Sequence, residues 1–208
     1  MRNPIYINII REPLDRFISY YYFLRSGDDF RPYLVRRKAG NNETFDHCVA
    51  NNGRDCDPAN MWLQIPFFCG HDAECWEPGS SWALEQAKNN LLQKYLLVGT
   101  TKWMDDFVKI LEIVLPRIFT GCLHKYLTVE AGLGDKSHLR KTTMKIKPQV
   151  DTVLKIRKSK VWQMEHEFYV FARDHFNSVK RHYTQVVSDG ADGIKAQQKF
   201  HYEKIRPR

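Results

Sequence analysis

The sequence lacks an apolar run long enough to span a bilayer, and it lacks internal repeats and low-complexity tracts. Its longest mostly apolar stretches, residues 5–10 and 95–98, are far shorter than the roughly 20 residues of a membrane helix. Met1 is followed by Arg-Asn-Pro instead of a leader with an apolar segment, so the chain as given is expected to carry neither signal peptide nor anchor.

Acidic residues are also in deficit, because 24 Asp and Glu stand against 32 Lys and Arg, a net charge of +8. This excess predicts a polyanionic partner, which is nucleic acid, an acidic membrane surface, or a sulfated or phosphorylated ligand. Charge alone does not choose among these partners.

The 208 residues, of which 43% are hydrophobic, are sufficient for one globular domain over residues 1–208. A strand is expected at 5–10, followed by a helix that opens at Glu12-Pro13 and closes at Gly27. Further helices are expected at 45–50, from Ser80-Ser81 onward, at 103–114 and over about 150–183, with a strand at 95–98 and a terminal strand or strap at 200–205. The order predicts an α/β fold with a parallel sheet.

Four cysteines, Cys48, Cys56, Cys69 and Cys75, lie within 28 residues, whereas Cys122 stands alone. This clustering predicts two local disulfides and one buried thiol, in a loop-rich region over residues 28–79. A zinc site that includes His71 is the alternative, but the spacings C-x7-C and C-x5-C do not fit the usual zinc pairs, and no metal is expected. Disulfides and the glycosylation sequon at Asn42 both indicate the secretory lumen.

Arg11 follows the first strand directly, and Ser19 lies eight residues further on. If a ligand lies along the helix that opens at Pro13, the guanidinium and the hydroxyl share phosphate oxygens. The alternative is that Arg11 pairs with Glu12 or Asp15 and that Ser19 is an ordinary helix residue.

Two further basic segments are candidate anion sites. Residues 136–147 combine lysines with the hydrogen-bond donors Ser137, Arg140 and Thr142, although a solvated basic loop is the alternative. The other segment places Arg31, Arg36, Arg37 and Lys38 after Asp28 and Asp29. Because the planar arginine fork suits carboxylate and sulfate, a chain of acidic sugars is the expected partner. No helix-turn-helix, zinc-finger or aromatic stacking motif accompanies the charges, so nucleic acid is not expected.

Five segments, spread over nearly the whole chain, carry a resemblance to a known family: IYINIIREPLDRFISYYYFLRSGDD, MWLQIPFFCGHDAECW, KSHLRKTT, VWQMEHEFYVFA and YEKI. Together they closely resemble the heparan sulfate 2-O-sulfotransferases, which have a P-loop-like sulfotransferase fold around a central parallel sheet. The resemblance implies transfer of a sulfuryl group from 3'-phosphoadenosine 5'-phosphosulfate to the 2-hydroxyl of iduronic or glucuronic acid in heparan sulfate. It also implies a homotrimer in the Golgi lumen, held in the membrane by an anchor of type II topology.

The resemblance assigns roles to individual residues. It implies that Arg11 and Ser19 hold the 3'-phosphate of the donor and that Cys48 pairs with Cys56 and Cys69 with Cys75. A second nucleotide-binding segment matches Tyr126, Ser137, Arg140, Thr142 and Lys145. The acceptor saccharide is expected at Tyr20, Asp28, Arg31 and Arg36. Lys204 matches a lysine important for activity, within a C-terminal strap at 184–208 that links subunits.

The chain also departs from this family. The first strand, the phosphosulfate loop with its lysine, the general-base histidine and the anchor lie upstream of the residues that match, so the chain reads as the C-terminal two-thirds of such an enzyme. None of His71, His166 and His175 takes the place of that base, and the chain alone is expected to be inactive. A non-catalytic heparan- and nucleotide-binding module is the second hypothesis, and a dermatan or chondroitin uronyl 2-O-sulfotransferase is the third.

Overall fold

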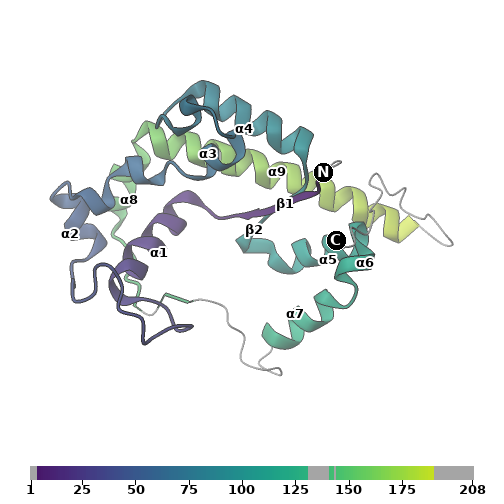
Figure 1. The fold of residues 1–208 in the computed structure, drawn as a ribbon, viewed down its shortest axis with the longest axis horizontal. Helices are drawn as coiled ribbons and strands as arrows, with labels where there is room; N and C mark the ends of the chain where they lie inside the picture. Colours follow the sequence, from purple (N-terminus) through teal and green to yellow (C-terminus); the bar gives the residue numbers. More distant parts are fainter. Residues whose placement is uncertain (1–3, 131–140, 143, 190–208) are drawn as a thin grey trace, which may run out of the picture.

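The computed structural model describes residues 4–130, 141–142 and 144–189. In this part of the chain, a short parallel sheet lies at the centre and helices surround it, as the α/β prediction requires (Figure 1). The two strands are β1 (Tyr6–Ile10) and β2 (Tyr95–Thr100). The α-helices are α1 (Pro13–Ser26), α2 (Phe45–Ala50), α3 (Gln64–Cys69), α4 (Ser81–Lys94), α5 (Met104–Val114), α6 (Pro116–Phe119), α7 (Cys122–Glu130), α8 (Val150–Arg157) and α9 (Lys160–Asp189).

The turn from β1 into α1 places Arg11 at the carboxyl end of the sheet. Pro13 is at the first helical position, and the Glu12 carboxylate accepts the Asp15 backbone N–H at 2.7 Å, so an acidic cap satisfies a free donor at the positive end of the helix. At the other end Gly27 has φ 75°, and its N–H closes the last turn on the Phe23 carbonyl. Ligands of open parallel sheets bind at this carboxyl edge.

Strand β1 is more exposed than its sequence predicts. It pairs in parallel with β2, from Tyr6 opposite Tyr95 to Ile10 opposite Thr100. Ile10 is buried, but 38% of Ile7 and 37% of Ile9 remain exposed. The apolar composition predicts a strand covered on both faces, whereas within the described residues β2 is its one hydrogen-bonded neighbour.

The core packs α9 along the sheet and against α4 (Figure 1). Phe168 of α9 meets Phe68 of α3 with ring centroids 5.0 Å apart, and Phe176 packs on Phe107 of α5. A second cluster joins α1 to α2, where Phe17 and Phe45 meet edge to face. The amphipathic helices predicted from Ser80 and at 103–114 are therefore present, and the Ser80 hydroxyl caps α4 by accepting the Ala83 N–H.

Two predictions of helix extent are wrong. The helix expected to run through 150–183 is two helices, because the chain breaks between Arg157 and Lys160, where the Ser159 hydroxyl accepts the Trp162 N–H as a new N-cap. The region 28–79 holds more helix than predicted, since α3 and the 3₁₀ helices η1 (Arg54–Cys56), η2 (Pro58–Met61) and η3 (Ala73–Trp76) follow α2. Short 3₁₀ turns leave little periodicity in a sequence.

Candidate functional site

A cavity of about 260 Å³ opens beside the N-terminal part of α1, at the carboxyl end of β1. It gathers five of the residues singled out from the sequence together with Arg16 and Phe23: Arg11, Ser19, Tyr20, Asp28 and Thr142. They come from two segments that lie more than a hundred residues apart in the sequence, and the fold brings them to one place.

Thr142 belongs to the site because hydrogen bonds hold its segment against α1 and against the loop that follows α1. The hydroxyls of Ser19 and Thr142 lie 3.0 Å apart, and Thr142 forms an antiparallel bridge with Asp28. Next to the bridge, the Asp29 N–H donates to the Lys141 carbonyl at 3.2 Å, and the Lys141 N–H donates to the Asp29 carboxylate at 2.8 Å. The Ser19–Thr142 pair therefore brings two hydroxyls from distant segments side by side at the cavity.

Within the described part of the chain, no carboxylate neutralises the charge of Arg11 through an ion pair. Its guanidinium forms no ion pair with the residues that the structure describes. The Glu12 carboxylate instead accepts the Asp15 backbone N–H at the start of α1 and lies 3.7 Å from His166. The alternative of an Arg11 pair with Glu12 or Asp15 is therefore wrong. A guanidinium at the mouth of a cavity with no carboxylate partner suits an anionic ligand.

Lys145 adds a second cation near Arg11. Burial lowers the pKa of Lys145 from its ordinary value, and the positive charge of Arg11 lowers it further, although Asp15 and Glu12 act in the opposite direction. Two like charges held close together weaken each other's charged form, and a bound anion would relieve that repulsion. The lysine-rich segment thus contributes the Thr142 hydroxyl to the cavity and places the charge of Lys145 near Arg11.

Arg16 is a member of the site that the sequence reasoning missed. It lines the cavity, one of its terminal nitrogens donates to the Met61 carbonyl at 2.6 Å, and its Nε is buried without a hydrogen-bond partner among the described residues. Burial lowers the pKa of Arg16, against the opposing charges of Glu165 and Glu12. The available signal was spacing, since Arg16 and Ser19 are three residues apart on one helix and so share a face.

Behind the cavity, a buried polar chain fixes the backbone of Arg11. The Arg11 N–H donates to Gln64 Oε1 at 3.0 Å, and Gln64 Nε2 donates to Glu165 at 3.3 Å. Glu165 is fully buried and also accepts the N–H groups of Leu63 at 2.8 Å and Ile65 at 3.1 Å. Burial raises the pKa of Glu165, whereas these donors and Arg16 oppose that change. Helix α9 therefore helps to set the position of the Arg11 backbone through α3.

The four predicted acceptor residues divide into two kinds. Asp28 is 2% exposed, accepts the Arg31 backbone N–H at 3.1 Å, and forms an ion pair with Arg36 at 3.1 Å. The Arg36 guanidinium also lies over the Phe23 ring, 4.4 Å from its centroid. Asp28 and Arg36 thus have internal partners, while Tyr20 is 55% exposed and Arg31 is exposed beside the Phe30 ring.

Other predicted residues lie elsewhere. Tyr126 is on α7, half-buried, and does not line the cavity. Ser137, Arg140 and Lys204 lie outside the described residues, as does the strap beyond residue 189. His71 is exposed, and His166 stacks on Trp162 at 4.5 Å. Burial lowers the pKa of His175 on α9. Among the described residues, no histidine lines the Arg11 cavity.

Both predicted disulfides are confirmed, with S–S distances of 2.06 Å for Cys48–Cys56 and 2.02 Å for Cys69–Cys75. Their formation excludes the zinc alternative, because the four sulfurs are bonded to each other. Cys122 is free and only partly buried, so the prediction of a buried thiol is wrong. Asn42 is exposed, as a glycosylation site needs to be.

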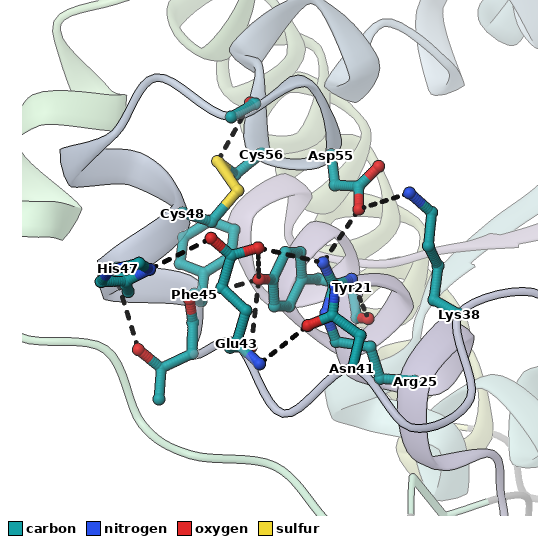
Figure 2. Close-up of polar contacts among 12 residues, drawn as sticks. Tyr21, Arg25, Lys38, Asn41, Glu43, Phe45, His47, Cys48, Asp55 and Cys56 are labelled. Carbon is teal, nitrogen blue, oxygen red and sulfur yellow. Dashed lines mark hydrogen bonds and ion pairs between the residues drawn. A yellow bond between two sulfur atoms is a disulfide. The ribbon is translucent and has the colours of Figure 1, made fainter.

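The first disulfide lies beside a charged cluster that ties its loop to α1 (Figure 2). Arg25, whose side chain is 2% exposed, pairs with Asp55 at 2.9 Å and with Glu43 at 3.5 Å, and it covers the Tyr21 ring at 3.6 Å. Lys38 reaches the same Asp55 at 3.0 Å. The disulfide-stapled region is therefore held in a fixed position against α1.

The helices of the described segments include none with the length and apolar character that a membrane crossing requires. The same segments contain no group of three or more His, Cys, Asp or Glu side chains placed to hold a metal ion.

Comparison with known proteins gives a consistent result. The model of the family described as "Sulfotransferase family" matches residues 1–172. Heparan sulfate 2-O-sulfotransferase 1 of Gallus gallus is 54% identical over 207 residues, and that of Homo sapiens is 53% identical over 207 residues. Heparin sulfate O-sulfotransferase of Drosophila melanogaster is 56% identical over 205 residues. The matches cover 99–100% of this chain but 56% of each relative, less than the two-thirds expected from the sequence.

Proposed function

Because the chain belongs to the sulfotransferase family, we propose that it carries the nucleotide 3'-phosphate site and part of the acceptor site of a heparan sulfate 2-O-sulfotransferase. The reaction is transfer of a sulfuryl group from 3'-phosphoadenosine 5'-phosphosulfate to the 2-hydroxyl of a uronic acid. The donor supplies the sulfuryl group, and the described residues bind and orient the donor nucleotide. Proteins of that activity, named for heparan sulfate, are more than half identical to this chain.

The observation that carries the proposal is the convergence of Arg11, Ser19 and Thr142 on one cavity, with the charge of Lys145 close enough to Arg11 for the two to interact. A phosphate with two negative charges accepts hydrogen bonds from both hydroxyls and offsets the repulsion between the guanidinium and the ammonium. Arg16, which lines the same cavity, supplies a further positive charge nearby.

The direct test is a comparison of two nucleotides that differ by one phosphate. Titration calorimetry should give measurable binding of adenosine 3',5'-bisphosphate and binding of adenosine 5'-monophosphate weaker by about a hundredfold, since two or more charged hydrogen bonds are lost. Equal affinity would show that the cavity does not hold the 3'-phosphate, and the proposal would then be wrong.

A binding module without chemistry remains the second hypothesis, and an assay of sulfate transfer separates it from the enzyme. Transfer of labelled sulfate to desulfated heparan by this chain would reject the module. Saturable heparin binding without transfer would support it, and labelling of dermatan in place of heparan would indicate the third hypothesis.

We also propose the Golgi lumen as the compartment and a homotrimer as the assembly. The lumen is supported by the two disulfides, which persist in oxidising compartments, and by the exposed sequon at Asn42. The trimer rests on the family resemblance alone, and Lys204 and the C-terminal strap are assigned on the same ground. Digestion with an N-glycosidase tests Asn42, and light scattering tests the trimer.

A further inference from the structure

The turn after α2 contains an Asn-Gly pair, Asn52-Gly53, which occurs once in the sequence. In an unfolded chain, an asparagine followed by glycine deamidates readily, because glycine has no side chain to hinder attack of its backbone nitrogen on the asparagine amide. Asn52 is exposed, and its backbone has φ 50°, a left-handed value that asparagine tolerates. The pair therefore combines a reactive sequence with access to water.

The backbone of this turn holds the attacking nitrogen in a hydrogen bond. The Gly53 N–H donates to the Cys48 carbonyl at 2.9 Å, and the Asn52 N–H donates to the Val49 carbonyl at 3.4 Å. Together these two hydrogen bonds form a Schellman motif, which ends α2. The Gly53 nitrogen must leave its carbonyl partner and lose its proton before it can attack, so the motif slows the reaction.

The Cys48–Cys56 disulfide keeps that motif in place. Cys48 supplies both the carbonyl that accepts the Gly53 N–H and one sulfur of the disulfide, so the cross-link closes a loop around the Asn-Gly pair. Gly53 also packs directly on this sulfur, because a Cβ at position 53 would lie 2.7 Å from Cys48 Sγ. Helix α2 has 6 residues, and helices this short are not stable on their own. Its last turn therefore depends on the cross-link.

Lys155 of α8 acts on the other reacting group, the side-chain amide of Asn52. Its ammonium donates to Asn52 Oδ1 at 3.1 Å and to the Val49 carbonyl at 2.8 Å. Attack on the amide carbon places negative charge on that side-chain oxygen, and a charged donor stabilises it. A cavity of about 160 Å³, lined by Asn52 and Lys155 among others, is large enough for the water that a later hydrolysis needs. The amide is thus activated while the attacking nitrogen is held back.

We propose that Asn52 is a deamidation site controlled by the Cys48–Cys56 disulfide, protected while the disulfide is intact and reactive once a thiol reductant opens it. The reductant converts the disulfide to two thiols and is itself oxidised to a disulfide. The Gly53 nitrogen then loses its proton to water and bonds to the side-chain carbon of Asn52. The bond from that carbon to Nδ2 breaks, and Nδ2 takes up a proton and leaves as ammonia. Water opens the resulting cyclic imide and gives aspartate or isoaspartate at position 52.

The modification is permanent, whereas reduction of the disulfide is reversible. Isoaspartate lengthens the main chain inside the loop that the disulfide closes, so reoxidation does not restore the original hydrogen bond of Gly53. The same loop carries Asp55, which pairs with Arg25 of α1 at 2.9 Å (Figure 2). A chain that has once been reduced therefore keeps an altered loop at the surface that contacts α1.

The test follows deamidation of the full chain at neutral pH by mass spectrometry. Tryptic peptide 39–54 contains Asn52, and its fragment ions separate this residue from Asn41, Asn42 and Asn51. The variant Cys48→Ala/Cys56→Ala should deamidate at Asn52 roughly tenfold or more faster than the oxidised parent chain, because the protecting hydrogen bond opens more often. The parent chain incubated with dithiothreitol should show the same acceleration.

The matched control is Cys69→Ala/Cys75→Ala, which removes the other disulfide, also one of short sequence separation. It should deamidate at Asn52 within about twofold of the oxidised parent, because that disulfide joins α3 to η3 and not the turn after α2. Equal acceleration in both variants would attribute the effect to a general loss of stability and overturn the proposal. Equal rates in the oxidised parent and in Cys48→Ala/Cys56→Ala would overturn it too, as would the absence of deamidation in every form.

Discussion

At the scale of single residues, the central feature is an arginine with no internal carboxylate partner among the described residues. Arg11 stands at the carboxyl end of β1, and its charge faces a cavity that also contains Ser19 and Thr142. The nearby acids serve other purposes, since Glu12 caps α1. A charge placed in this way is expected to act through a ligand instead of through the stability of the fold.

Arg11→Ala should weaken binding of adenosine 3',5'-bisphosphate by about 1.5 to 3 kcal/mol, the usual contribution of a charged hydrogen bond. Calorimetric titration measures this change, and Arg11→Lys should keep part of the affinity because it preserves the charge but loses the fork. Chemical denaturation should show little change in stability for either variant. Unchanged nucleotide affinity in Arg11→Ala would remove this residue from the site.

Lys145 is expected to make nucleotide binding at the proposed site depend on pH. Burial and the charge of Arg11 lower its pKa, so the ammonium loses its proton at a lower pH than an ordinary lysine does. Affinity for the bisphosphate should therefore fall as the pH rises from about 7 to about 10, because the phosphates stay fully charged while the lysine becomes neutral. The same titration on Lys145→Arg should give a flatter profile, since arginine remains protonated throughout. A flat profile in the parent chain would contradict this assignment.

At the scale of elements, α9 supports the start of α3 through one buried carboxylate. Leu63, the N-cap of α3, provides no side-chain cap, and Glu165 accepts the N–H groups of Leu63 and Ile65 in its place. The same carboxylate holds Gln64, which in turn holds the Arg11 backbone. The start of α3 therefore depends on a residue about a hundred positions away, and the Arg11 backbone depends on the same residue through Gln64.

Glu165→Gln should destabilise the fold by about 2 kcal/mol, because the new amide group faces the Gln64 amide donor and leaves buried groups unpaired. Denaturant unfolding at neutral pH measures this change. The control is Glu167→Gln, two residues further along α9, where the carboxylate that pairs with Lys88 is exposed and the pair should contribute less than about 1 kcal/mol. An equal effect of the two substitutions would contradict the capping role.

The raised pKa of Glu165 makes the difference in stability between the parent chain and Glu165→Gln depend on pH. The native state binds the proton of Glu165 more tightly than the unfolded chain does. In the unfolded chain this carboxyl has its ordinary pKa of about 4.5. The stability of the parent chain relative to Glu165→Gln should therefore decrease as the pH rises from about 4.5 towards neutrality, because the unfolded state releases that proton first.

Local signals in the sequence predicted the elements whose limits depend on neighbouring residues. Helix α2 was predicted with its observed bounds, and the Glu12 and Ser80 caps were read correctly. The break before α9 was missed, although Ser159 is an ordinary capping residue, because the apolar spacing continues across it. The exposure of β1 was mispredicted, since an apolar pattern does not reveal what covers it.

The site itself was predicted unevenly for a similar reason. Basic and hydroxyl residues in suggestive segments identified Arg11, Ser19 and Thr142, and the structure brings these three together. Arg16 and Glu165 were missed because their contacts, to Met61 and to Leu63–Ile65, join distant segments. Burial of a charged side chain is a property of the fold, and spacing alone does not show it.

At the scale of the whole molecule, two disulfides cross-link the fold. The Cys48–Cys56 disulfide closes a loop with a sequence separation of 8, and it anchors the wall that faces α1. Cys48→Ala/Cys56→Ala should lower the free energy of unfolding by about 2.5 kcal/mol, the value expected for a loop of this size. Cys122→Ala, which removes a free and partly buried thiol, should have a much smaller effect. Equal losses in denaturant unfolding would show that the cross-link contributes no more than an unpaired thiol.

The bridge between Asp28 and Thr142 has a thermodynamic consequence. Thr142 contacts the helix residue Ser19, and the same backbone bridge adjoins the loop that carries Arg31 and Arg36, the predicted acceptor residues. Under the proposed function, a nucleotide that contacts Thr142 also stabilises that loop, and a sugar chain bound to the loop stabilises the nucleotide site in return. By linkage, each ligand would increase the affinity of the other by the same factor, so nucleotide and saccharide are expected to bind with positive cooperativity.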